Sequence, residues 1–124
     1  MFAGEVDLHN WYKPSIDKQS LKEFSKRSDS KGIFDICLFA VALLISGSLC
    51  FVTWGTWWSI LALLLYGNIF YCKIISIQHE TNHETYFKSR SLNRFFYNLT
   101  SLLGGFEAVR WKWSHFHHHT YTIF

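Results

Sequence analysis

IFDICLFAVALLISGSLCFVT at residues 33–53 and WWSILALLLYGNIFYCKIISI at residues 57–77 are the two stretches that decide the fold of this chain. Each has roughly 20 residues, which is long enough to cross a hydrocarbon core of about 30 Å as a helix. Asp35 and Lys73 are their charged residues, and both lie close enough to an end to reach the membrane surface. The pattern predicts an all-α fold built on a hairpin of two transmembrane helices; a buried hairpin in a soluble protein is the alternative.

The link between the two stretches is Trp54-Gly55-Thr56, which predicts a tight turn at a membrane surface. Glycine permits the turn, and tryptophan favours the membrane–water interface. The link carries no Lys or Arg, whereas the outer flanks carry Lys26, Arg27, Lys31, Lys73, Lys88, Arg90 and Arg94. Because positive residues stay on the cytoplasmic side, we expect an integral, multi-pass membrane protein with both termini in the cytoplasm.

Composition divides the 124 residues into four parts. Residues 1–32 are polar and form an expected cytoplasmic segment with a short amphipathic helix, in which Ile16, Leu21 and Phe24 alternate with lysines. A solvated tail is the alternative. The two spans, 33–53 and 57–77, follow, and residues 78–124 form a basic and aromatic region. The net charge of +3 is too small to favour nucleic acid as a partner.

Two histidine clusters lie in this last region, HETNH at residues 79–83 and HFHHH at residues 115–119. If the second span continues as a helix past Ile77, His79 and His83 share one face, because residues four apart are neighbours on a helix. That spacing lets both side chains bind one metal ion or two adjacent ions. A pair of histidines at this spacing also arises by chance, so the first cluster is a weak signal by itself.

The second cluster makes a metal site the better interpretation. On a helix, His118 and His119 lie at about 300° and 400° from His115, whereas His117 lies at about 200°, on the opposite side. His115, His118 and His119 are therefore candidate ligands and His117 is not. A polyhistidine tag or a solvated tail would also be rich in histidine, but Phe116 and the preceding WKWS argue against a tag.

The segment between the clusters predicts an amphipathic helix. Its apolar residues recur at three- and four-residue steps and end before Gly104-Gly105: Leu92, Phe95, Phe96, Leu99, Leu102 and Leu103. We call these six residues the apolar stripe. Core packing and anchoring in the membrane interface are equally compatible with the stripe, and either would return the chain toward the first cluster.

All-imidazole ligation without cysteine argues against structural zinc and favours iron and oxygen chemistry. Three nearby carboxylates, Glu80, Glu84 and Glu107, either orient these imidazoles or are simply solvated; we favour solvation for Glu84.

Residues 79–122, HETNHETYFKSRSLNRFFYNLTSLLGGFEAVRWKWSHFHHHTYT, resemble the membrane fatty acid desaturases with histidine boxes. The resemblance includes the first and second boxes, H-x-x-x-H and H-x-x-H-H, and the segment between them. The upstream WYKPSIDKQSLKEFSKRSD and the W-G-T-W-W turn are similar to those of bacterial members. The resemblance therefore extends over nearly the whole chain.

The resemblance implies transmembrane helices capped by a cytoplasmic site with two irons. Such proteins use O₂ and two electrons, from a ferredoxin or a cytochrome b5-type donor, to introduce a double bond into the acyl chain of a membrane lipid. By position, His79 and His83 are the implied first-box iron ligands. The second-box ligands are His115, His118 and His119.

The family also has a third histidine box after a further pair of spans, and the 124 residues contain none. We therefore expect the N-terminal part of such a desaturase, inactive by itself, with a missing C-terminal half as a possible partner. Two alternatives stay open: a histidine-box hydroxylase of alkanes, sterols or carotenoids, and a non-catalytic, truncated membrane protein that binds metal.

Overall fold

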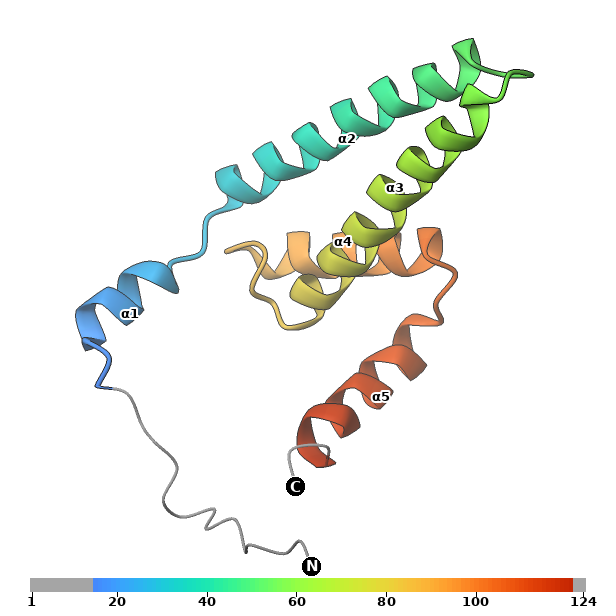
Figure 1. Cartoon of the computed structure of the whole chain (residues 1–124). Coiled ribbons are helices and arrows are strands. Elements are labelled where there is room, and N and C mark those ends of the chain that lie inside the picture. Colours follow the sequence, from blue (N-terminus) through green and yellow to red (C-terminus); the bar gives the residue numbers. More distant parts are fainter. Residues whose placement is uncertain (1–14, 122–124) are drawn as a thin grey trace, which may run out of the picture.

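The computed structural model describes residues 15–121, which form five helices and no strand (Figure 1). The all-α fold is therefore confirmed. The helices are α1 (Lys18–Phe24), α2 (Asp29–Val52), α3 (Trp58–Asn82), α4 (Arg90–Leu103) and α5 (Ala108–Tyr121).

α2 and α3 form the hairpin, with 24 and 25 residues. α2 begins four residues before the predicted span because the Ser28 side chain caps it, accepting a hydrogen bond from the Lys31 backbone N–H at 3.4 Å. α3 continues beyond Ile77 into the first histidine cluster, as predicted. Between the helices, Gly55 has a φ of 81°, a left-handed conformation that suits glycine.

The apolar side chains of the hairpin are mostly exposed. Leu44, Ile45 and Leu64 are 71%, 67% and 66% exposed, and both helices are long and apolar enough to cross a membrane. A hairpin in the core of a soluble protein would instead be covered by the rest of the chain. Exposure on this scale therefore favours contact with lipid.

α2 and α3 are joined at the end of the hairpin opposite the turn. The Lys73 ammonium and the Asp35 carboxylate form an ion pair at 2.6 Å, and the Tyr86 hydroxyl, in the loop after α3, donates a hydrogen bond to the same carboxylate. The two charged residues of the predicted spans thus neutralise each other.

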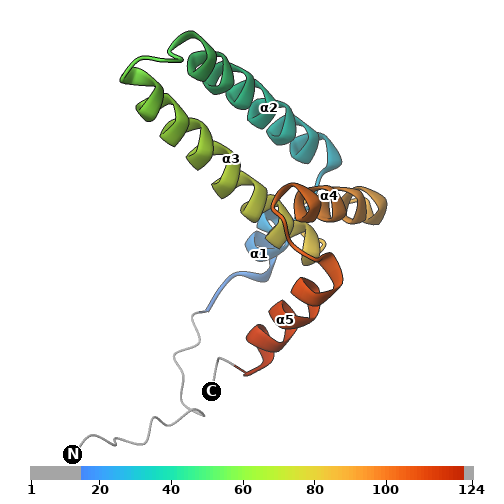
Figure 2. The same cartoon turned by 90° about the vertical axis from the view of Figure 1, so that its right-hand side faces the viewer.

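α4 runs across this base of the hairpin, and α5 continues on the side away from the hairpin (Figures 1 and 2). α4 packs against α3, where the Gln78 amide donates a hydrogen bond to the Ser101 hydroxyl at 3.0 Å. It ends at Gly104 and Gly105, as predicted, and Gly105 has a φ of 73°. This turn redirects the chain into α5.

The predicted short helix before the hairpin is confirmed and corresponds to α1. The Asp17 side chain caps it by accepting a hydrogen bond from the Ser20 backbone N–H at 2.9 Å, and none of its residues is buried. Phe24 is 90% exposed. Its placement on a membrane stays a prediction, and residues 1–14 of the predicted N-terminal segment lie outside the described residues.

Candidate metal centre

The end of α3 positions the first two histidines. His79 lies in the last turn and His83 is the C-terminal cap, so their rings are one turn apart, with centroids at 4.8 Å. The helix closes when the Thr85 backbone N–H donates to the Glu80 carbonyl at 3.0 Å, with Glu84 left-handed at a φ of 56°. This closure fixes the direction of the backbone at His83.

α5 positions the second pair. The Glu107 carboxylate caps the helix by accepting hydrogen bonds from the backbone N–H groups of Val109, at 3.0 Å, and Arg110, at 2.5 Å. Two turns further on, His115 and His119 lie one above the other with ring centroids 4.5 Å apart. The cap therefore fixes where α5 begins and, with it, the positions of His115 and His119 opposite α3.

The two pairs converge into one cluster. His79, His83, His115 and His119 each offer one nitrogen, and these four atoms lie within 4.8 Å of one another. The Nε2 atom of His115 is 2.9 Å from that of His83 and 3.0 Å from that of His119. We call these four residues the histidine cluster.

His118 and His117 are placed differently. The His118 ring lies beside the cluster, with its centroid 6.2 Å from His115 and 5.5 Å from His119, but its nitrogens are not among the four convergent atoms. Consecutive helical residues point about 100° apart, so His118 and His119 do not aim at one point. The His117 ring stacks on Tyr121, with centroids 5.5 Å apart.

Burial and neighbouring imidazoles disfavour the charged form of two rings of the cluster, His83 and His115. Burial, with the neighbouring His79 and other imidazoles, lowers the pKa of His115 to about 4. Burial, His79 and His119 also lower the pKa of His83, although the nearby Glu80 carboxylate opposes this shift. Neutral imidazoles have a free lone pair, and the neutral form is the one that binds metal.

Trp111 supports the cluster from α5. Its indole stacks on the His115 ring with centroids 4.6 Å apart and planes at 10°. Sequence analysis did not single out this residue. The signal was available, because Trp111 precedes His115 by four residues and therefore shares its helical face.

Residues at the start of α2 hold the loop that follows His83. The Arg27 guanidinium donates a hydrogen bond to the Glu84 carbonyl at 2.7 Å, and the Asp29 carboxylate accepts hydrogen bonds from the backbone and the hydroxyl of Ser89 at 2.8 and 2.5 Å. These partners are 57 and 60 residues apart in the chain. No local pattern could have revealed them.

The three carboxylates near the cluster each have another partner. Glu80 accepts a hydrogen bond from the Thr85 hydroxyl at 2.5 Å, Glu84 pairs with Arg90 at 3.4 Å, and Glu107 caps α5. The expected solvated state of Glu84 is consistent with its half-exposed side chain. These contacts shape the ends of the two helices.

The donor set fits a transition-metal ion. Ligand bonds of about 2.1 Å to two nitrogens that are 2.9 or 3.0 Å apart subtend an angle of about 90° at the ion, which octahedral coordination accommodates. Two ligands of one such ion are at most about 4.2 Å apart. A spread of up to 4.8 Å therefore also leaves room for two adjacent ions.

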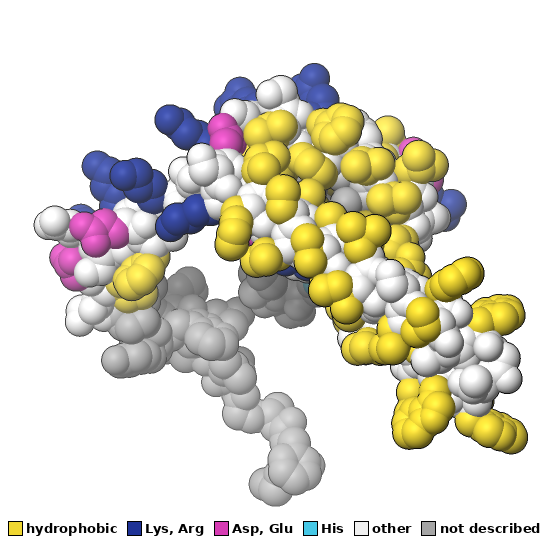
Figure 3. All heavy atoms as spheres, turned by 90° about the horizontal axis from the view of Figure 1, so that it is seen from above, with side chains coloured by type: hydrophobic (Ala, Val, Ile, Leu, Met, Phe, Trp, Pro, Cys, Tyr) yellow, Lys and Arg dark blue, Asp and Glu magenta, His cyan; other side chains and the backbone are white. Residues whose placement is uncertain are grey.

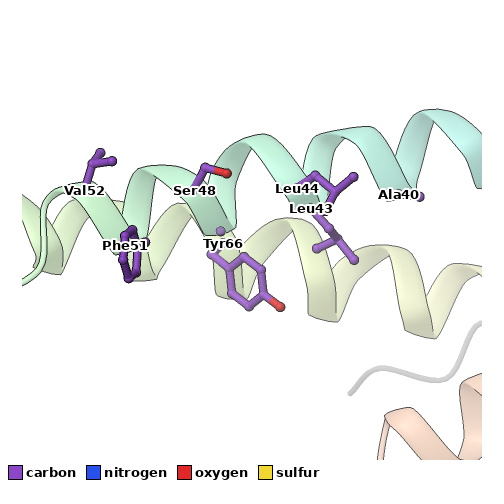
Figure 4. A pocket seen from close by; sticks show the side chains of 8 residues that line it. Ala40, Leu43, Leu44, Ser48, Phe51, Val52 and Tyr66 are labelled. Carbon is purple, nitrogen blue, oxygen red and sulfur yellow. The ribbon is translucent and has the colours of Figure 1, made fainter.

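A shallow groove on the hairpin lies away from the histidine cluster. It follows the half of α2 nearer the turn, and its lining includes Phe51 of α2 and Tyr66 of α3 (Figure 4). Its lining is almost entirely apolar, and the histidine cluster is at the opposite end of the hairpin. The groove is therefore not part of the candidate metal centre.

The fold and this centre define a helical, membrane-associated protein with histidines clustered at the end of an apolar hairpin. A family model described as Fatty acid desaturase matches residues 53–124, more than half of the chain. The chain belongs to the fatty acid desaturase family, as the sequence resemblance indicated. No curated protein and no solved structure matches it.

Proposed function

We propose that this chain contributes to an O₂-dependent oxidoreductase that introduces a double bond into an acyl chain of a membrane lipid. His79, His83, His115, His118 and His119 are its proposed iron ligands, and a ferredoxin or a cytochrome b5-type protein is its proposed electron donor. The convergence of four imidazoles from two helices, in a chain of the desaturase family, is the observation that carries this proposal.

Bound iron would supply the activation of O₂ and the oxidation that removes two hydrogens from the chain. The residues of this protein would hold the iron and surround its ligands. The imidazoles offer ring nitrogens as ligands, Trp111 covers one side of His115, and the loop contacts of Arg27 keep His83 at the end of α3. Second-box His118 lies next to His119 at the side of the cluster, where it would hold an adjacent ion.

The position of the cluster relative to the hairpin suits a lipid substrate. Both histidine pairs lie at the end of α3 that is opposite the turn, where the Lys and Arg residues flanking the spans are also found. With the positive residues in the cytoplasm, we propose an integral, multi-pass protein with cytoplasmic termini and a cytoplasmic metal centre. Acyl chains would then reach the centre from the membrane.

The test is metal binding by the full chain. The 124-residue protein is purified in detergent without oxygen, loaded with Fe(II), and analysed for iron per chain. His115→Ala should lose most of the bound iron, because His115 lies within 3.0 Å of two other ligand nitrogens. The matched control, His117→Ala, removes an imidazole that faces Tyr121 and should retain the iron.

Equal iron in both variants, or none in the unmodified protein, would overturn the proposed centre. Mass spectrometry of membrane lipids from cells that express the protein with an electron donor and with a chain carrying the third histidine box tests the reaction separately. Loss of two hydrogens supports desaturation, whereas gain of one oxygen identifies a hydroxylase. Because iron content is measured without turnover, failure of the reaction and failure of the metal site are distinguishable.

A further inference from the structure

α4 packs against the protein with its polar face. Its buried residues are all polar or carry a hydroxyl, and each is 9% exposed or less: Asn93, Tyr97, Thr100 and Ser101. A surface helix of a soluble protein normally buries its apolar face instead. The burial pattern of α4 is therefore the reverse of the usual one.

Specific hydrogen bonds hold this polar face. The Asn93 side chain accepts from the Phe87 backbone N–H at 3.1 Å and donates to the Phe87 carbonyl at 2.9 Å. The Tyr97 hydroxyl donates to the Ala108 carbonyl at 2.5 Å. With the bond between Gln78 and Ser101, these contacts bind α4 to α3 and to the segments on either side of it. The rotation of α4 about its axis is thus determined by polar groups that have partners.

The apolar stripe consequently faces outward. Its six residues fall within an arc of about 120°. Phe95, Leu102 and Leu103 are 59%, 77% and 48% exposed, and the other three are half-buried. Exposure of each large apolar side chain to water would cost about 1.5–3 kcal/mol relative to burial, so water is a poor environment for this face.

The stripe continues the apolar surface of the hairpin. α4 lies across the base of the hairpin, opposite the turn, in both ribbon views (Figures 1 and 2). Viewed from above, apolar side chains extend from the hairpin over the neighbouring helix, and Lys and Arg side chains lie at the rim (Figure 3). Arg90 and Arg94, both exposed, belong to α4 and lie on the side of the helix away from the stripe.

We propose that α4 lies in the plane of the membrane interface, with the apolar stripe in contact with lipid acyl chains. Arg90 and Arg94 then point away from the acyl chains, toward the headgroups and water. An amphipathic helix with apolar residues on one face and cationic residues on the other is suited to this environment. Continuity with the hairpin surface and the cationic rim identify the lipid bilayer as the partner.

This placement has a consequence for the histidine cluster. α4 is the element that joins α3, which carries His79 and His83, to α5, which carries His115 and His119. A helix fixed at the interface sets the height of both pairs above the acyl chains. The inference itself does not depend on which metal binds or which reaction follows.

The test measures the depth of single positions along α4. The full chain, with Cys37, Cys50 and Cys72 replaced by alanine, is labelled with a nitroxide at one introduced cysteine and reconstituted into phosphatidylcholine–phosphatidylglycerol vesicles. Stripe positions are Phe95→Cys and Leu102→Cys. Control positions are Arg94→Cys and Asn98→Cys, which are exposed and polar on the same helix. Circular dichroism verifies that each labelled protein keeps its helical content.

Collisions with O₂, which concentrates in lipid, should be several-fold more frequent at the two stripe positions. Collisions with a water-soluble nickel chelate should be more frequent at the two controls. Equal exposure to the chelate at all four positions would place the stripe in water and overturn the proposal. Protection of the stripe from both reagents would also overturn it, since a protein surface would then cover α4.

Discussion

The indole of Trp111 lies flat against the imidazole of His115, with ring centroids 4.6 Å apart and planes inclined by 10°. His115 is also the ring whose Nε2 is closest to two other histidines of the cluster, at 2.9 and 3.0 Å. Trp111 therefore limits the orientations open to the ring at the middle of the candidate centre. A residue that orients a ligand in this way acts on metal affinity without touching the metal.

Replacement of Trp111 by alanine should weaken metal binding by about 10-fold or more, in the range found when groups that orient metal ligands are lost. Trp111→Phe should retain most of the affinity because it keeps an aromatic face for His115. The measurement is a titration with Co(II), followed by its visible absorption. Trp113→Ala is the matched control, because Trp113 is 61% exposed and packs near Phe116. Equal affinities of the two alanine variants would contradict a positioning role.

Gly32 should not tolerate a side chain. A Cβ at this position would lie 2.5 and 2.6 Å from two carbons of the Phe87 ring, which is fully buried and stacks on Phe96. Because the ring has no space into which to move, Gly32→Ala should destabilise the fold by about 1–3 kcal/mol. The measurement is the thermal midpoint in detergent, followed by circular dichroism.

Gly67→Ala is the control for this prediction. Gly67 also lies within a helix of the hairpin, but a Cβ there would meet nothing within 4 Å. Alanine has the higher helix propensity, by about 1 kcal/mol, so Gly67→Ala should keep or raise the midpoint. An equal fall of the midpoint in both variants would contradict the prediction, because the loss would then come from replacing a helical glycine and not from the contact between α2 and Phe87.

The sequence predicted the elements well and the contacts between them poorly. Long apolar runs and a three- to four-residue periodicity predicted the hairpin and α4, because these signals are local. The contacts of Gly32 with Phe87 and of Arg27 with Glu84 join residues more than 50 positions apart. Such contacts depend on how the helices pack, and neither partner has a distinctive neighbourhood in the sequence.

The sequence also predicted the candidate centre in part, because the spacing of the histidines is a local signal. Spacing identified the histidines, but it could not separate His118 from His119, since helical angles alone put both near one face. The apolar stripe posed the same difficulty, because periodicity indicates that a face is apolar without indicating what covers it. Only the burial of Asn93 and Ser101 on the opposite face decided which side of α4 faces the protein.

Substitutions of Asp35 and of Lys73 should have strongly coupled effects on the stability of the fold. Their ion pair, at 2.6 Å, joins two apolar helices, and loss of either partner leaves a charge beside lipid. Asp35→Asn and Lys73→Met should each lower the thermal midpoint. The double variant should lose less stability than the sum of the two, with an interaction energy of about 0.5–3 kcal/mol. Additive losses would show that the pair is not a unit. Tyr86→Phe, which keeps both charges, should have a smaller effect than either single variant.

Replacement of Glu84 by glycine should stabilise the fold. Its φ of 56° places it in the left-handed region, which costs a residue with a Cβ about 1–2 kcal/mol. Glycine avoids this cost but loses about 0.5–1 kcal/mol through the greater freedom of the unfolded chain. The lost ion pair with Arg90 is exposed and contributes little. The hydrogen bond from Arg27 uses the backbone carbonyl, so it survives the substitution.

Glu84→Gly should therefore raise the thermal midpoint by a small amount, and Glu84→Val should lower it, because a β-branched residue is the least tolerant of a positive φ. The same two variants report on the metal centre. His83 precedes this position directly, so a backbone forced out of the left-handed region by valine should also displace His83 and weaken Co(II) binding. If valine lowered the midpoint but left Co(II) affinity unchanged, the closure of α3 would stabilise the helix without orienting His83.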